Sequence, residues 1–147
     1  MFKHILVPVD GSPASQVSLR SALDMAASYG ASITAVHVLP DDHAFSHRPA
    51  APDQAAEPNV SDSRAQGQAL LDAVSEAARA RQVPCRTVLA RGDRPHRKIL
   101  ETAHARGCDL IAMACHGQLG LKGALLGSQT QKVLVHSPVP VLVFRAE

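Results

Sequence analysis

Glycine and small polar residues are concentrated over residues 113–128, which read MACHGQLGLKGALLGS. The segment follows an apolar run over 109–113 that is typical of a buried strand, and it precedes a helix-like run from Ser128. At such a junction glycine lets backbone N–H groups approach an anion closely, and the helix N-terminus adds a favourable dipole. Ser128 supplies a hydroxyl at the predicted helix start, and Gln131 gives the spacing of a capping box. The pattern predicts a phosphate-binding loop.

Strand-like and helix-like segments alternate along the whole chain. Apolar runs indicate strands over residues 2–9, 31–39, 84–90, 109–114 and 139–144. Apolar residues at helical spacing, with their start and stop signals, indicate helices over 13–29, 61–81, 94–106 and 128–136. For the first helix, Ser12 is the predicted N-cap, Pro13 the first helical residue and Gly30 the stop. The alternation predicts an α/β single domain: a doubly wound five-stranded parallel sheet, strand order 3-2-1-4-5, with four helices.

The predicted topology selects the same loop as the chemistry does. In doubly wound sheets ligands bind at the carboxyl ends of the strands, at the point where the strand order reverses. Here that point lies between the first and fourth strands. Asp10 ends the first of them, and residues 114–117 end the fourth. We therefore expect the loop and Asp10 to border one site.

Composition narrows the class of protein. Of the 147 residues 46% are apolar and 3% aromatic, which favours a core of aliphatic side chains between a parallel sheet and its helices. A net charge of +2 without a basic cluster argues against nucleic acid and anionic membranes as partners. Cys85, Cys108 and Cys115 form neither an even disulfide set nor a zinc spacing, which favours reduced, buried thiols.

Two features concern the setting of the domain. The chain opens directly into a strand, without a signal peptide, and has no apolar run long enough to cross a bilayer, so we expect a cytoplasmic protein. Residues 40–60 are rich in Pro, Ala, Asp and His and have no apolar period, which predicts a long flexible surface loop.

The chain resembles the universal stress protein family over nearly its whole length. ATP-binding members carry Gly, two residues, Gly, nine residues, Gly, then Ser or Thr. Gly117, Gly127 and Ser128 match this pattern, whereas Ala114 stands in place of the first Gly. The opening strand through Ser12 and the ending PVPVLV also look like those of the family.

The resemblance implies a cytoplasmic stress-response or signalling homodimer of one domain, residues 1–147, that binds ATP, alone or with Mg²⁺. The nucleotide would be a signal or structural ligand more than a substrate. The sequence offers no paired carboxylates, no Walker lysine and no evident base for a water, so we expect no catalytic residues and only slow hydrolysis. We also expect no metal-ligating side chains. Carried over by position, the resemblance places three groups of residues. Those around the base and ribose are Pro8, Asp10 and Val38. Those beside the sugar and phosphates are Met113, Ala114, His116 and Gly117, and those at the helix start are Gly127, Ser128 and Gln129.

Several roles stay open at the level of sequence. Ala114 is strained if the family's glycine serves a positive φ, but it fits if the glycine only provides clearance. Asp10 suits either a ribose or metal-water contact or the capping of the Gly11–Ser12 turn. Lys122 could reach a phosphate or lie in solvent. The motif is not a Walker A loop, because no lysine directly precedes Ser128.

Alternative functions follow from the same residues. The loss of the first glycine motivates a protein of this fold that binds no nucleotide and acts through protein contacts only. An enzyme that forms an adenylated intermediate would need a substrate pocket and catalytic groups for which 147 residues leave little room.

The strand over 139–144 is expected at a sheet edge. Its side chains are apolar on both faces, and Pro140 cannot donate to a ladder, which suits an edge strand. A long apolar edge invites pairing unless it is covered. The simplest cover is the same strand of a second copy, and the resemblance implies the same homodimer contact.

Overall fold

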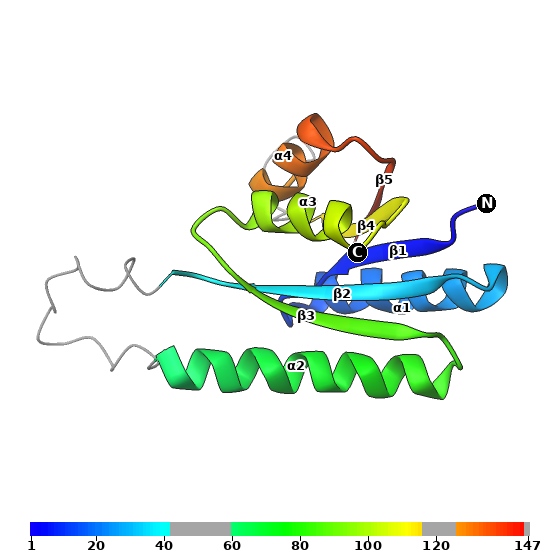
Figure 1. Ribbon diagram of the computed structural model, residues 1–147, viewed down its shortest axis with the longest axis horizontal. Coiled ribbons are helices and arrows are strands. Elements are labelled where there is room, and N and C mark those ends of the chain that lie inside the picture. Colours follow the sequence, from blue (N-terminus) through cyan, green and yellow to red (C-terminus); the bar gives the residue numbers. More distant parts are fainter. Residues whose placement is uncertain (42–59, 116–125, 146–147) are drawn as a thin grey trace, which may run out of the picture.

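The computed structural model describes residues 1–41, 60–115 and 126–145. Figure 1 shows a sheet with helices on both of its faces. The elements in chain order are β1 (His4–Pro8), α1 (Pro13–Tyr29), β2 (Ser32–Leu39), α2 (Val60–Ala80), β3 (Cys85–Arg91), α3 (Pro95–Ala105), β4 (Leu110–Cys115), α4 (Ser128–His136) and β5 (Val141–Arg145). The strands pair in parallel in the order β3-β2-β1-β4-β5, which confirms the predicted fold. The loop predicted over 40–60 falls almost entirely outside the described residues.

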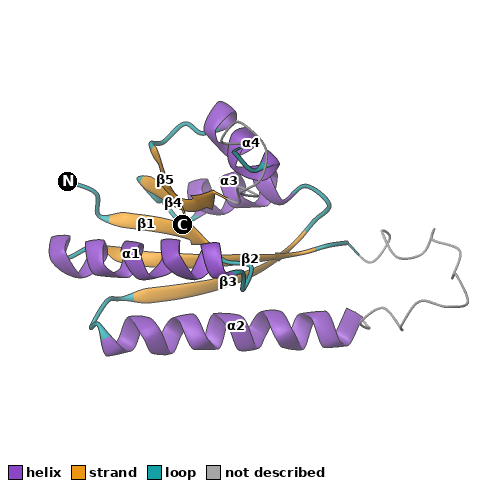
Figure 2. Cartoon of the chain, turned by 180° about the vertical axis from the view of Figure 1, so that it is seen from behind, coloured by secondary structure: helices purple, strands orange, loops and turns teal. Residues whose placement is uncertain are grey.

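Two apolar cores cover the two faces of the sheet. One core packs side chains of α1 and α2 against the sheet, for example Leu23 and Leu71 around Ile33. The other packs α3 and α4, with Ile99 and Val133 around Ile111. Both views show α1 and α2 on one side of the sheet and α3 and α4 on the other (Figures 1 and 2). The starts of the helices therefore gather at the carboxyl ends of the strands.

The first helix begins and ends where its residues predict. The Ser12 side chain accepts a hydrogen bond from the Ser15 N–H at 3.1 Å, Pro13 follows as the first helical residue, and Gly30 ends the helix with φ +67°. The terminal strands are shorter than predicted. Residues 2–9 and 139–144 were the expected strands, whereas β1 covers His4–Pro8 and β5 covers Val141–Arg145. Ends of this kind commonly differ by one or two residues, because the ladder ends before the extended backbone does.

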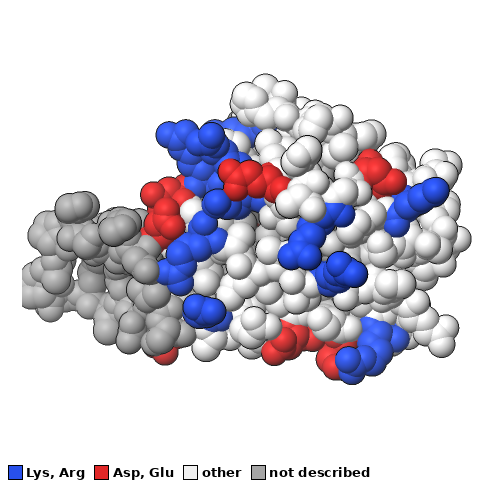
Figure 3. All heavy atoms as spheres, viewed as in Figure 1, with Lys and Arg blue, Asp and Glu red and all other residues white. Residues whose placement is uncertain are grey.

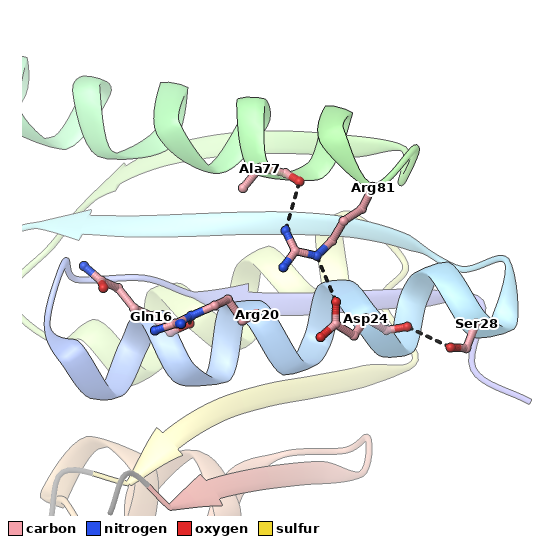
Figure 4. A network of polar contacts seen from close by, with 6 residues as sticks. All are labelled: Gln16, Arg20, Asp24, Ser28, Ala77 and Arg81. Carbon is pink, nitrogen blue, oxygen red and sulfur yellow. Dashed lines mark hydrogen bonds and ion pairs between the residues drawn. The ribbon is translucent and has the colours of Figure 1, made fainter.

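A polar contact links α2 to α1 at the end of the sheet remote from the carboxyl ends of the strands. Arg81, which follows α2, donates from Nε to the Asp24 carboxylate of α1 over 2.8 Å and contacts the Ala77 carbonyl at 3.4 Å (Figure 4). About a third of the Arg81 side chain is exposed, so the ion pair itself adds less than 1 kcal/mol. The pair joins the two helices at the surface, whereas the apolar core holds α2 against the sheet.

The described cysteines are free thiols, and two of them are buried. Burial raises the pKa of Cys108 to about 11, although a hydrogen bond with the Thr34 hydroxyl acts in the opposite direction. Burial also raises the pKa of Cys85. Thiols that keep their protons at neutral pH are poor nucleophiles. The prediction of buried thiols is confirmed for Cys108 and Cys115 and is wrong for Cys85, which is only half-buried.

Within the described residues, no helix has the length and apolarity that a membrane crossing requires. In the same part of the chain, His, Cys, Asp and Glu side chains form no group of three that could hold a metal ion.

Candidate functional site

A cavity of about 380 Å³ lies at the carboxyl ends of the strands. It forms there because β1 pairs with β2 only as far as Pro8, opposite Val36, while β2 continues beside β3 to Leu39. The central strand thus ends before its neighbour and leaves a crevice. Its walls are formed by Pro8, Val9, Asp10, Ser15, Val36, His37, Val38, Pro95, Ile99, Met113, Ala114, Gly127, Ser128, Gln129 and Thr130.

Eight of the ten residues predicted to form the site lie around this one cavity: Pro8, Asp10, Val38, Met113, Ala114, Gly127, Ser128 and Gln129. The other two, His116 and Gly117, fall outside the described residues, as does Lys122. The structure therefore brings the end of β1, the end of β2, the end of β4 and the start of α4 together, as the topology predicts.

Several lining residues were missed from sequence. Ser15 comes from the first turn of α1, and Pro95 and Ile99 come from α3. The available signal was topological, since every helix of such a sheet begins at the same edge. The sequence around His37 does not indicate that this residue lines the site, because its role depends on which face of β2 its side chain occupies.

The turn between β1 and α1 is held by short hydrogen bonds. The Asp10 carboxylate accepts from the Ser12 N–H at 2.9 Å, and the Asp10 N–H donates to the Ser15 hydroxyl at 3.2 Å. Gly11 lies between them with φ +81°, a conformation that favours glycine. The turn-capping interpretation of Asp10 is confirmed, and its carboxylate also borders the cavity.

Helix α4 presents to the cavity an N-terminus whose own N-cap residue makes no side-chain hydrogen bond. Gly127 is the N-cap residue, with no side-chain hydrogen bond, and Ser128 is already the first helical residue. The prediction that Ser128 caps this helix is therefore wrong by one position. The buried Thr130 hydroxyl donates to the Ala114 carbonyl at 3.1 Å and fixes α4 against the end of β4. The Thr130 contact thus positions the first amides of α4, and the N-cap residue Gly127 offers them no side-chain acceptor.

Gln129 joins the starts of α4 and α3. Its Oε1 accepts from the His96 N–H at 3.0 Å and lies 3.2 Å from His96 Nδ1. Arg94, the N-cap of α3, makes no side-chain capping bond, so Gln129 provides from α4 the acceptor that α3 lacks. The side chain of Gln129 is therefore engaged with α3, and its backbone is the part that remains to face a ligand.

Ala114 has an ordinary backbone conformation. It lies in β4, it is buried, and Gln82 is the only described non-glycine residue with positive φ. Of the two open interpretations, strain from a missing glycine is thus wrong, and only the clearance of the methyl group remains to matter.

The electrostatics of the site favour an anion at the helix starts. The first turns of α1, α3 and α4 all border the cavity, and each helix carries partial positive charge there. Figure 3 shows Lys and Arg side chains beside Asp and Glu side chains on one face of the molecule. Within α3, Lys98 and Glu101 form an ion pair at 2.9 Å. That mixture of charges is typical of a solvated surface rather than of a single-sign field.

The chain is a doubly wound α/β protein with a cavity at the reversal point of its sheet, bordered by helix N-termini. This is the place where proteins of that class commonly bind their ligands. The chain belongs to the universal stress protein family: the model of that family matches residues 1–145.

Relatives and solved structures agree with this assignment. The chain is 35% identical to a universal stress protein of Thermus aquaticus over 99% of this chain and 100% of that one. It is 30% identical to universal stress protein YxiE of Bacillus subtilis, again over 99% and 100%. A family member from Burkholderia pseudomallei matches with a TM-score of 0.76 at 25% identity, over 98% of this chain and 96% of that chain.

Two further solved structures share the fold at lower identity. A universal stress protein in complex with cAMP has a TM-score of 0.73 at 21% identity, over 99% of both chains. A protein from Archaeoglobus fulgidus in complex with dAMP has a TM-score of 0.71 at 19% identity, over 96% of both chains.

Proposed function

We propose that this protein is an ATP-binding universal stress protein that acts as a homodimer in stress response or signalling. The observation that carries the proposal is the cavity, which is bordered both by the end of β1 and by the start of α4, where the N-cap residue is a glycine. Pro8, Val38 and Met113 form an apolar wall suited to a base, and Asp10 would meet the ribose. The backbone amides from Gly127 onward would hold phosphate oxygens at the helix start.

The comparisons support an adenine nucleotide. The two structures of this fold in complex with cAMP and dAMP both hold adenine nucleotides. A cavity of about 380 Å³ falls within the size range of small-ligand sites, which is about 300–1,000 Å³. Mg²⁺ would arrive bound to the phosphates of ATP, since such ions are commonly held by substrate oxygens and water.

The chemistry of the lining favours a bound signal over a turned-over substrate. Asp10 is the carboxylate in the described lining, and it already accepts a hydrogen bond within its own turn. A group so engaged is a poor general base for activating water. The alternative, the same fold acting only through protein contacts, rests on Ala114 alone, and Ala114 has an unstrained conformation.

Binding is tested by thermal unfolding with ATP and Mg²⁺. A ligand present at 100 times its dissociation constant adds about 2.7 kcal/mol to the free energy of unfolding, so the melting temperature should rise by several degrees. Inorganic phosphate at equal ionic strength serves as the control for salt effects. An unchanged melting temperature at millimolar ATP would favour the protein without a nucleotide site.

Restoring the family's first glycine is expected to change ATP affinity little. Because Ala114 is not strained, Ala114→Gly relieves no backbone energy, and glycine within a strand costs about 0.5–1 kcal/mol of stability. We expect a lower melting temperature and a dissociation constant within about threefold of the wild-type value, measured by titration calorimetry. Binding tightened by about tenfold or more would show instead that the methyl group obstructs the ligand.

The proposed dimer contact is the outer edge of β5. The Ile111 N–H donates to the Pro140 carbonyl at 3.0 Å, and in a parallel ladder this places the N–H and C=O groups of Val141 and Val143 on the side away from β4. Leu142 is 36% exposed beside this edge. An apolar edge with unpaired backbone groups fits an identical strand across a two-fold axis.

A further inference from the structure

The hydrogen-bond ladder between β1 and β2 follows a regular alternation. The Ser32 N–H donates to the Lys3 carbonyl at 2.9 Å, and the Val9 N–H donates to the Val36 carbonyl at 2.9 Å. In a parallel pair each bonded residue of β2 receives one bond and gives one, so the even-numbered residues of β2 face β1. The next bond of this series would run from the Val38 N–H to the Val9 carbonyl.

That next bond is not formed between these two described residues. Instead, Nδ1 of His37 lies 2.7 Å from the Val9 carbonyl oxygen. A carbonyl can only accept, so Nδ1 carries the proton and donates it. The imidazole therefore satisfies the acceptor that the Val38 amide would otherwise use, and the ladder ends one bond early.

The early end of the ladder falls inside the cavity. Val9, His37 and Val38 all line it. The odd-numbered residues of β2 bond to β3, as the Gly92 N–H does to the Leu39 carbonyl at 2.9 Å. The backbone N–H and C=O of Val38 therefore point toward the side on which β1 has ended, where they form a donor–acceptor pair at the cavity.

Helix α2 makes room for the imidazole. A β-carbon at Gly67 would lie 2.8 Å from His37 Cδ2 and 3.1 Å from a methyl of Leu89, so the side chains of this helix position and of His37 exclude one another. Glycine in a helix interior is less favourable than alanine. The imidazole ring thus occupies a space that exists because α2 has glycine at position 67, a residue with low helix propensity.

We propose that His37, seated against Gly67, is a positioning residue that holds the Val9 carbonyl and thereby reserves the Val38 backbone amide for the edge of a nucleobase. The inference rests on the proposed nucleotide site and adds a residue that acts through the backbone of another. His37 selects for a ligand with a hydrogen-bonding base edge, as opposed to phosphate alone.

Two nearly isosteric substitutions separate the hydrogen bond from the bulk of the side chain. His37→Asn keeps a donor at the position of Nδ1, whereas His37→Leu places a methyl group there. In His37→Leu the Val9 carbonyl loses its partner and is expected to take the Val38 amide, because a buried unpaired carbonyl is costly. Gly67→Ala provides a second route, since it displaces the ring from a position that is not itself part of the cavity lining.

The first readout needs no ligand. Amide hydrogen exchange of Val38, followed by NMR, is expected to slow by about tenfold or more in His37→Leu and to remain as in the wild type in His37→Asn. Equal exchange of the Val38 amide in all three proteins would show that His37 does not end the ladder, and it would overturn the inference even if ATP binds.

The second readout compares ATP with inorganic tripolyphosphate in titration calorimetry. His37→Leu and Gly67→Ala are expected to weaken ATP binding by about tenfold, which matches the loss of one hydrogen bond, and to leave tripolyphosphate binding unchanged. Equal losses for both ligands, or none for ATP, would overturn the role in base recognition. A wild-type protein that binds neither ligand would overturn the proposed function instead, and the exchange of Val38 would still decide the role of His37.

Discussion

Gly127→Val is expected to abolish ATP binding while the fold stays intact. Gly127 has φ −52° and ψ 145°, angles that any L-residue adopts, so valine brings no backbone strain at the helix start. Its branched side chain would instead occupy the space through which a phosphate oxygen reaches the first amides of α4. We expect the dissociation constant to rise by about 100-fold or more. Because valine is a poorer N-cap residue than glycine, the melting temperature without ATP should fall by a few degrees while the transition stays cooperative.

Ser128→Ala is the matched control for this substitution. Because Gly127 is the N-cap, the change removes a hydroxyl from the first helical residue and no capping bond. Its melting temperature should equal that of the wild type, and ATP binding should weaken by about tenfold at most, which is the effect of one hydrogen bond. Wild-type affinity in Gly127→Val would falsify the placement of phosphate at the start of α4.

Val141→Lys combined with Val143→Lys is expected to convert the protein to a monomer. Both side chains are only partly buried on the edge strand, and charges on such an edge disfavour pairing with a second copy. Light scattering after size-exclusion chromatography would show the mass of one chain in place of two. Aggregation would mean that the apolar edge strand pairs nonspecifically with other chains once the symmetric contact is lost.

Val143→Pro separates the edge from the core. The proline removes an N–H that faces away from β4 and leaves the inner ladder bonds in place, which edge strands tolerate. We expect this variant to be monomeric with its helices intact by circular dichroism. A wild-type protein that is monomeric at micromolar concentration would contradict the proposed dimer.

Local signals carried most of the fold. The Ser12 cap, Pro13 and Gly30 set the bounds of α1, and the apolar runs located each strand to within a few residues. The topology then predicted the location of the site, since the ends of β1 and β4 and the start of α4 meet at one edge of any such sheet. Neither step required knowledge of how side chains pack.

The features that sequence did not reveal depend on contacts between distant elements. The role of His37 arises only once β1 ends beside it and Gly67 of α2 passes over its ring. Ser128 was misplaced as a cap because a glycine one residue earlier assumes that position without a side chain. Pro95 and Ile99 reach the cavity because α3 packs beside α4, which no local pattern specifies.

The hydrogen bond from the His96 amide to Gln129 has a consequence for how this region opens. The N-cap residue of helix α3 makes no side-chain hydrogen bond, so its first turn gains an acceptor from Gln129 while α4 stays docked. Opening of either helix start withdraws support from the other, and the two first turns behave as one cooperative unit. A phosphate held at the start of α4 would therefore also slow the fraying of α3, a helix whose own amides it need not touch.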